Sequence, residues 1–295
     1  MQRLVINIEN LQQHMAKSDE NSTNQLLSPK RTGARKTSEI PVHVLEQLNN
    51  GKIETANLVE WLAVDQRILL NQLLIQYQRT IYLAPILQGI DQLKKQTVNT
   101  INEAIGTGIL EQTIQHNDSA FYQIMAVHQA DLVRCWAAYS VGKNTSLSIA
   151  DTLKQIQQFA ADAHFGVREI SWLAVREKIS SNLEESIAIL STWAVSNNEH
   201  IRRFASESTR PRGVWCTHIE VLKRTPMLAL PILNALKSDP SRYVQNSVAN
   251  WLNDAAKTCP LFVQDLYDRW SRESNTKATT YILKRAIRSL HVDNR

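Results

Sequence analysis

The stretch GVREISWLA (166–174) decides the fold, because related copies of it recur along the chain. LVRCWAAYS (132–140) starts 34 residues before it, and HIRRFASES (200–208) starts 34 residues after it. In all three, a β-branched apolar residue is followed by arginine at the same place. A fourth copy, YVQNSVANW (243–251), starts 43 residues further on and lacks the arginine. This spacing predicts a repeat architecture.

Amphipathic segments lie between the copies: SLSIADTLKQIQQFAADA (146–163), LEESIAILSTWAV (183–195) and MLALPILNALKSD (227–239). A helix pair that repeats every 34 to 43 residues is typical of an α-solenoid, in which stacked pairs share one core. The V-R or I-R start of the copies is closer to HEAT repeats than to tetratricopeptide repeats, whose W-x₂-L-G-x₂-Y pattern is absent. We therefore predict an all-α protein: an α-solenoid of HEAT-like helical repeats that forms an α–α superhelix.

Three regions are predicted along the chain. Residues 1–40 include the stretch PKRTGARK (29–36) and little that could be buried, which indicates a flexible basic N-terminal arm. Residues 41–125 have apolar side chains at helical intervals and form an N-terminal helical region. Residues 126–295 form the HEAT-like repeat region, and the face lined by its second helices is the predicted binding surface.

Composition narrows the class of protein. Hydrophobic residues make up 43% of the chain, and 8 Gly with 8 Pro are few for a turn-rich β fold. The net charge of +5 permits binding to a polyanion. The three cysteines form no CxxC pair, and no two histidines have a metal-ligand spacing. No apolar run approaches the roughly 20 residues of a membrane span. We expect a soluble, cytoplasmic protein without a metal site and without a membrane partner.

Two stretches carry a resemblance to a known family. RRFASESTRPRGVW (202–215) and SRYVQNSVANWLNDAAK (241–257) resemble the AlkC branch of the AlkC/AlkD group of DNA alkylation-repair glycosylases. The resemblance implies a HEAT-like solenoid that binds double-stranded DNA on a concave basic surface. It also implies hydrolysis of the N-glycosidic bond of cationic alkylpurines, 3-methyladenine and 7-methylguanine, with no cofactor and no metal. We expect a monomer.

The resemblance also implies site residues. Glu207, Trp215 and Asp254 match the glutamate, tryptophan and aspartate of the two family stretches. Asp254 would stabilise the positive charge on the sugar and position water, and Glu207 would assist it. The family has a further glutamate where this chain has Trp172, in SWLAVR (171–176). Glu169 lies about one helical turn earlier and could partly substitute for that glutamate.

Trp172 can also be placed by geometry alone. The aligned repeats put Val167, Ser171 and Ala174 on a buried stripe, with Trp251 on the matching stripe of the fourth copy. Trp172 is five residues past Val167, roughly 140° around the helix, so it should face the binding surface or a neighbouring repeat. Together with Glu207, Asp254 and Trp215, it completes the predicted catalytic set.

A further set is predicted to contact DNA. Arginines would bind phosphates, and two asparagines that form a polar stripe with Asp254 would bind phosphate or sugar. The alternatives are ion pairs between repeats for the arginines and a water-facing stripe for the amides. The set is Arg168, Arg202, Arg203, Arg210, Arg212, Asn246 and Asn250.

Two other functions stay open at this stage. Because Trp172 replaces the family glutamate, the chain could be a non-catalytic binder of damaged or branched DNA. HEAT arrays also serve as protein–protein scaffolds, although a scaffold does not require the aspartate, tryptophans and basic residues seen here.

Overall fold

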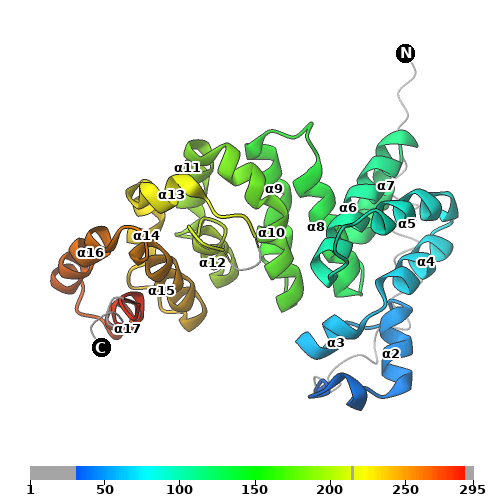
Figure 1. The fold of residues 1–295 in the computed structure, drawn as a ribbon, viewed down its shortest axis with the longest axis horizontal. Helices are drawn as coiled ribbons and strands as arrows, with labels where there is room; N and C mark the ends of the chain where they lie inside the picture. Colours follow the sequence, from blue (N-terminus) through cyan, green and yellow to red (C-terminus); the bar gives the residue numbers. More distant parts are fainter. Residues whose placement is uncertain (1–30, 214–215, 290–295) are drawn as a thin grey trace.

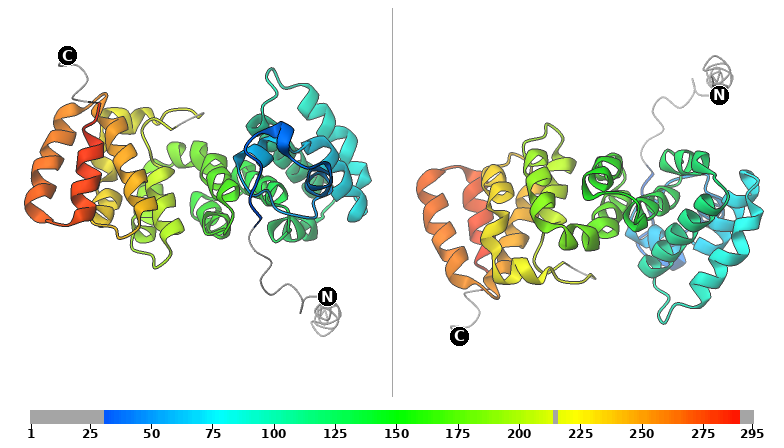
Figure 2. Two further views of the ribbon diagram at one scale, coloured as in Figure 1. Left: turned by 90° about the horizontal axis from the view of Figure 1, so that it is seen from below. Right: turned by 90° about the horizontal axis from the view of Figure 1, so that it is seen from above.

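The computed structural model describes residues 31–213 and 216–289. Within these residues the chain is helical and contains no strand. The helices follow an arc, with α16 and α17 at one end and α2 to α5 at the other (Figure 1). Figure 2 shows two further views, each turned by 90° from Figure 1, and the helices follow the same order along the long axis. The predicted all-α solenoid is confirmed.

The N-terminal region comprises short helices and one long one. Its elements are η2 (Thr37–Glu39), α2 (Val42–Asn49), α3 (Leu58–Ala63), α4 (Gln66–Gln76), η3 (Thr80–Tyr82), α5 (Leu83–Asp91), α6 (Val98–Gln115) and α7 (Ser119–Ala126).

The repeats follow in helix pairs. The second helices α8, α10, α12, α15 and α17 form the inner layer, in which α8 packs on α10, α12 on α15 and α15 on α17. The first helices of the pairs form the outer layer. The elements are α8 (Asp131–Lys143), α9 (Ile149–Ala160), α10 (Phe165–Ser181), α11 (Leu183–Trp193), α12 (Glu199–Glu207), α13 (Glu220–Arg224), η4 (Pro226–Ala229), α14 (Leu230–Leu236), α15 (Arg242–Ala256), α16 (Pro260–Glu273) and α17 (Lys277–Ala286).

The apolar stripe of the repeats is buried as the sequence predicts. Val167 and Val244, which hold equivalent positions in α10 and α15, are both fully buried. Ser171 and Trp251 on the same two helices are fully buried as well. Trp251 satisfies its indole N–H by donating to the backbone oxygen of Thr209 at 2.9 Å. The stripe therefore forms the shared core between stacked pairs.

The arginine that follows each stripe start has one structural role in all three copies. Arg134, Arg168 and Arg202 each donate through Nη1 to the backbone oxygens six and five residues earlier, at 2.7–3.2 Å. These oxygens belong to the loop that precedes each inner helix. Gln245 of the fourth copy likewise donates to the backbone oxygen six residues earlier, at 2.8 Å. The V-R signature thus fixes the loop between the two helices of a pair.

Two of these arginines also connect successive repeats. Arg134 Nε lies 2.8 Å from Asp162 Oδ2, and Arg202 Nε lies 2.6 Å from Asp239 Oδ2. Each aspartate comes from the loop before the next inner helix. The arginine therefore sets the distance between neighbouring pairs, and so contributes to the curvature of the array.

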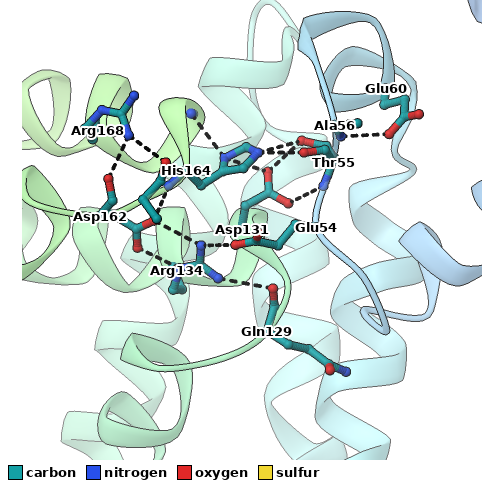
Figure 3. Close-up of polar contacts among 12 residues, drawn as sticks. Glu54, Thr55, Ala56, Glu60, Gln129, Asp131, Arg134, Asp162, His164 and Arg168 are labelled. Carbon is teal, nitrogen blue, oxygen red and sulfur yellow. Dashed lines mark hydrogen bonds and ion pairs between the residues drawn. The ribbon is translucent and has the colours of Figure 1, made fainter. Parts of the chain in front are cut away.

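The loop before α3 is attached to the repeats by buried polar contacts (Figure 3). Thr55 donates to the Asp131 carboxylate from its backbone N and from Oγ1, each at 2.9 Å. The His164 ring nitrogen Nε2 lies 2.8 Å from the backbone oxygen of Thr55. Glu54 forms an ion pair with Arg134. These contacts fix α3 against the first turns of α8 and α10.

Glycine allows the closest approach at this junction. A Cβ placed on Gly166, in the first turn of α10, would lie 2.8 Å from Trp61 Nε1 on α3. The Trp61 side chain can therefore lie this close to α10 because position 166 has no side chain. No helix of residues 31–213 and 216–289 is both long enough and apolar enough to cross a membrane.

Candidate active site

A cavity of about 450 Å³ lies where α3, α10, α12 and α15 meet. This size is within the range of small-molecule binding sites. Four aromatic side chains contribute to its wall. Most of its polar side chains lie on the inner helices, while Asn99 lies on α6 and Arg210 follows the end of α12. The lining includes Trp61, Phe165, Glu169, Trp172, Arg203, Glu207, Arg210, Tyr243, Asn246 and Asn250.

Charged side chains of α10, α12, the segment after α12 and α15 form a series of alternating sign beside the cavity. Arg203 Nη2 lies 2.7 Å from Glu169 Oε1 and 3.7 Å from Glu207 Oε2. Arg210 Nη1 lies 2.7 Å from Glu207 Oε1, and its Nη2 lies 2.7 Å from Asp254 Oδ2. The order is therefore acid, base, acid, base, acid, and we call these five residues the charge ladder. Two arginines serve three carboxylates, so the carboxylates at the two ends share their arginine with Glu207.

Glu207, at the centre of the charge ladder, is almost completely buried. Its carboxylate accepts a hydrogen bond from Ser247 Oγ at 2.7 Å in addition to the contacts with the arginines. Burial raises the pKa of Glu207, but Arg203 and Arg210 outweigh burial, and the net shift is downward. Glu207 borders the cavity, and its oxygens already have protein partners.

Asp254, the predicted catalytic aspartate, is not one of the residues that line the cavity. It is buried and receives two hydrogen bonds from Arg210 on Oδ2 at 2.9 and 2.7 Å. The stripe of Asn246, Asn250 and Asp254 drifts by about 80° over eight residues of helix, so its last member turns away from the cavity. The structure therefore pairs Asp254 with Arg210, and its catalytic role stays a prediction.

Glu169 has the most exposed side chain of the three carboxylates of the site. Its side chain is 39% exposed, compared with 6% for Glu207 and 7% for Asp254. Trp172 donates from Nε1 to Glu169 Oε2 at 2.9 Å, while Arg203 contacts Oε1. Both oxygens are thus oriented, and the carboxylate still borders the cavity. This is the residue that the sequence marked as a partial substitute for the missing family glutamate.

Trp172 lines the cavity, in agreement with the side of α10 on which its spacing places it. It is only 4% exposed. The guanidinium carbon of Arg176 lies 6.0 Å from its ring centroid. Trp215, the other tryptophan of the predicted set, lies outside the described residues.

Several arginines predicted to bind DNA are engaged within the protein. Arg202 is held by Asp239 and by two loop carbonyls, so it forms the alternative ion pair between repeats. Arg168 is held by loop carbonyls and lies 5.5 Å from the ring centroid of Tyr243. Arg203 and Arg210 belong to the charge ladder. Arg212 is half-buried, and its Nε has no hydrogen-bond partner among the described residues.

The two predicted asparagines do line the cavity. Asn246 Oδ1 accepts a hydrogen bond from Tyr281 Oη at 2.7 Å. Asn250 Oδ1 accepts one from Arg288 Nη2 at 3.0 Å. Their amide groups therefore link the cavity to α17, rather than forming a plain water-facing stripe.

Sequence reasoning missed three aromatic residues of the cavity wall. Tyr243 is three residues before Asn246 on α15, and this helical spacing could have revealed it. Phe165 begins α10 next to a repeat copy. Trp61 comes from α3, in a part of the chain where the family stretches have no counterpart, and no sequence signal pointed to it. In the described residues, no group of three or more His, Cys, Asp or Glu side chains could hold a metal ion.

Comparison with known proteins places this geometry in a structural class. The Pseudomonas fluorescens alkylpurine DNA glycosylase AlkC, solved bound to DNA containing an abasic-site analogue, superposes with a TM-score of 0.62 and 22% identity. The match covers 88% of this chain and 66% of that chain. The chain therefore has the helical-repeat fold of the AlkC/AlkD group, and the predicted resemblance is confirmed at the level of the fold.

Other similar proteins agree with this class. AlkD2 from Streptococcus mutans matches with a TM-score of 0.53 and 21% identity over 73% of this chain and 98% of that chain. The protein YhaZ of Bacillus subtilis, described as uncharacterized, is 43% identical over 120 residues. That match spans 41% of this chain and only 33% of YhaZ. No protein-family model matches the sequence.

Proposed function

We propose that this protein is a DNA glycosylase of alkylation repair that releases cationic alkylpurines, such as 3-methyladenine and 7-methylguanine, from duplex DNA. The observation that carries the proposal is the oriented, partly exposed carboxylate of Glu169 at the edge of the aromatic cavity. The fold shared with AlkC, a protein solved with DNA that contains an abasic-site analogue, supports the same class of substrate.

The reaction requires few catalytic groups from the protein. An alkylated purine with a positive charge is already a good leaving group, so the bond from C1′ to the base breaks with its electron pair moving to the base. Positive charge develops on the sugar, and a carboxylate held nearby stabilises that charge. Water then adds to C1′ and gives up a proton to the carboxylate, which passes it to solvent. Glu169 can serve both steps without a metal or a cofactor.

The surroundings of Glu169 suit this role. The indole N–H of Trp172 and the guanidinium of Arg203 fix the two carboxylate oxygens, so little reorganisation is needed when charge develops. The aromatic faces of Trp61, Phe165 and Tyr243 can attract a cationic base through cation–π interaction. Glu207 and Asp254 contact arginines at 2.7 Å as Glu169 does, but their side chains are only 6% and 7% exposed, and their role is to hold the charge ladder.

Excision from methylated duplex DNA tests the proposal. We expect wild-type protein to release methylpurines and Glu169→Gln to lose most of the activity. The matched control is Glu177→Gln, because Glu177 lies on the same helix with its side chain 87% exposed and does not border this cavity. Activity that survives Glu169→Gln unchanged would contradict the assignment of Glu169. Loss of activity in Asp254→Asn with normal folding, and not in Glu169→Gln, would return the role to Asp254.

A second function is favoured by one observation: each of the three carboxylates of the charge ladder already has an arginine nitrogen at 2.7 Å. A non-catalytic binder of damaged or branched DNA would show tight duplex binding without base release. Absence of both binding and release would leave the protein–protein scaffold.

A further inference from the structure

Three arginines gather around one tyrosine on the helix beyond the cavity. The guanidinium carbon of Arg242, at the start of α15, lies 3.6 Å from the ring centroid of Tyr281 on α17. That of Arg285, also on α17, lies 5.5 Å from the same centroid. Arg288 is one turn further along the chain, beyond the end of α17. We call Arg242, Arg285 and Arg288 the Tyr281 cluster.

The Tyr281 cluster differs from the other arginines of the inner layer. All three side chains are exposed, and none forms an ion pair with a carboxylate of residues 31–213 and 216–289. By contrast, Arg134, Arg202, Arg203 and Arg210 each contact at least one aspartate or glutamate within 2.9 Å. The cluster is a concentration of positive charge that the described part of the protein does not neutralise.

The cations are also crowded. Burial lowers the pKa of Arg288, and the charge of Arg285 lowers it further. Stacking on Tyr281 orients two planar guanidiniums, and this reduces the freedom they would lose on binding a ligand. Planar, oriented guanidiniums without a carboxylate partner are well suited to phosphate oxygens, which they can bind with two hydrogen bonds each.

The cluster is joined to the cavity by hydrogen bonds. Tyr281 Oη donates to Asn246, and Arg288 donates to Asn250, and both asparagines line the cavity. A ligand that occupies the cavity and extends along the inner layer towards α17 therefore meets the cluster next.

We propose that Arg242, Arg285 and Arg288 bind the phosphate backbone of duplex DNA next to the nucleotide held at the cavity. This inference rests on the proposed function. Neighbouring packed helices lie about 8–10 Å apart, and one DNA strand advances about 3.4 Å per nucleotide. The phosphates bound by the cluster would therefore be roughly two to three nucleotides from the one at the cavity.

The sequence analysis predicted phosphate contacts for other arginines, and we assign these contacts to the Tyr281 cluster. Arg202 and Arg168 hold loops and neighbouring repeats, so they have few donors left for a phosphate. Exposed cations without a carboxylate partner are the ones best able to contact phosphates. Among the arginines of the inner layer next to the cavity, those of the Tyr281 cluster are exposed and form no ion pair with a carboxylate of the described residues.

The test measures binding of a fluorescein-labelled DNA duplex with an abasic-site analogue over a range of salt concentrations. The variants are Arg285→Gln, Arg242→Gln and the pair Arg285→Gln with Arg288→Gln. The control is Arg272→Gln, which removes the same charge from an exposed position on α16 in the outer layer. We expect each cluster substitution to weaken binding several-fold and to reduce the slope of log K against log salt by about one. Arg272→Gln should change neither quantity.

The outcomes separate this inference from the proposed function. If wild-type protein binds and excises but the cluster variants behave like Arg272→Gln, the phosphate site is overturned and the glycosylase proposal stands. If wild-type protein does not bind the duplex at all, both fail. Because the substituted side chains are exposed, the variants should keep the wild-type melting temperature. Arg242 lies on α15 and Arg285 on α17. If the variants on α17 unfold, Arg242→Gln therefore still tests the phosphate site.

Discussion

Trp172 donates its indole N–H to Glu169 Oε2 at 2.9 Å, three residues away on the same face of α10. Position 172, where the resemblance implies a glutamate, thus carries a side chain that orients another glutamate one turn earlier. A carboxylate is still present at the cavity, but it comes from a different position of the same helix.

Removing only the indole N–H should show how much this orientation matters. In Trp172→Phe the aromatic ring remains, but Oε2 of Glu169 loses its donor. A hydrogen bond to a charged group contributes about 1.5–3 kcal/mol. If the bond acts in the transition state, excision should fall roughly ten- to hundredfold. Single-turnover release of 3-methyladenine measures this rate.

The control for Trp172→Phe is Trp193→Phe. Trp193 is another nearly buried tryptophan, which packs on Phe204 with ring centroids 5.2 Å apart and does not line the cavity. The substitution Trp193→Phe should leave excision unchanged. Equal rates for Trp172→Phe and wild type would show that Arg203 alone orients Glu169.

The charge ladder should be required for stability as well as for the site. In Arg210→Gln, the buried carboxylates of Glu207 and Asp254 both lose a cation at 2.7 Å. Removing one partner from a buried ion pair costs about 3–5 kcal/mol, because the remaining charge stays desolvated. Urea unfolding should show a loss of this size. Adding Asp254→Asn to Arg210→Gln should recover part of it, and a double mutant less stable than either single variant would contradict the pairing.

Stability should depend on pH through Glu207. Its pKa in the folded protein is lowered from its ordinary value of 4.5, because Arg203 and Arg210 outweigh the effect of burial. The charged form is therefore favoured by folding, and the stabilisation is present above pH 4.5 and is lost as pH falls through the lower folded value. Urea unfolding from pH 7 to pH 3 should show this decline. In Glu207→Gln the decline should be smaller, and at the lowest pH the two proteins should approach equal stability.

The sequence predicts the fold well because the repeat is local and periodic. The stripe of Val167, Ser171 and Trp251 follows from spacing alone, and all three residues are buried. The side of α10 that carries Trp172 follows from the same rule. These features depend only on helix geometry, which is the same in every repeat.

The site is predicted less well, because it depends on contacts between distant segments. Asp254 matches a family motif, but Arg210 on another element covers it. Arg202 was a candidate for DNA contact, and only the position of Asp239, 37 residues later, shows that it is paired. Trp61 reaches the cavity because Thr55 and its neighbours attach α3 to α10 (Figure 3). Which side chains of distant segments pair with each other cannot be predicted from one segment alone.

The junction between α3 and α10 gives a final prediction. In Gly166→Ala, the new Cβ would lie 2.8 Å from Trp61 Nε1, so the Trp61 side chain must shift and the wall of the cavity must change. Forcing extra volume into a packed junction costs about 1–3 kcal/mol. We expect a loss of stability in this range and reduced excision, because Trp61 belongs to the cavity wall.

Gly89→Ala is the matched control, because a Cβ on Gly89 in α5 meets nothing within 4 Å. There the helix preference of alanine should stabilise the protein by about 0.5–1 kcal/mol and leave excision unchanged. The two glycine substitutions should therefore change the free energy of unfolding in opposite directions. If Gly166→Ala were as stable and as active as wild type, α3 would not need to touch α10 at this point. The cavity would then not depend on the N-terminal region.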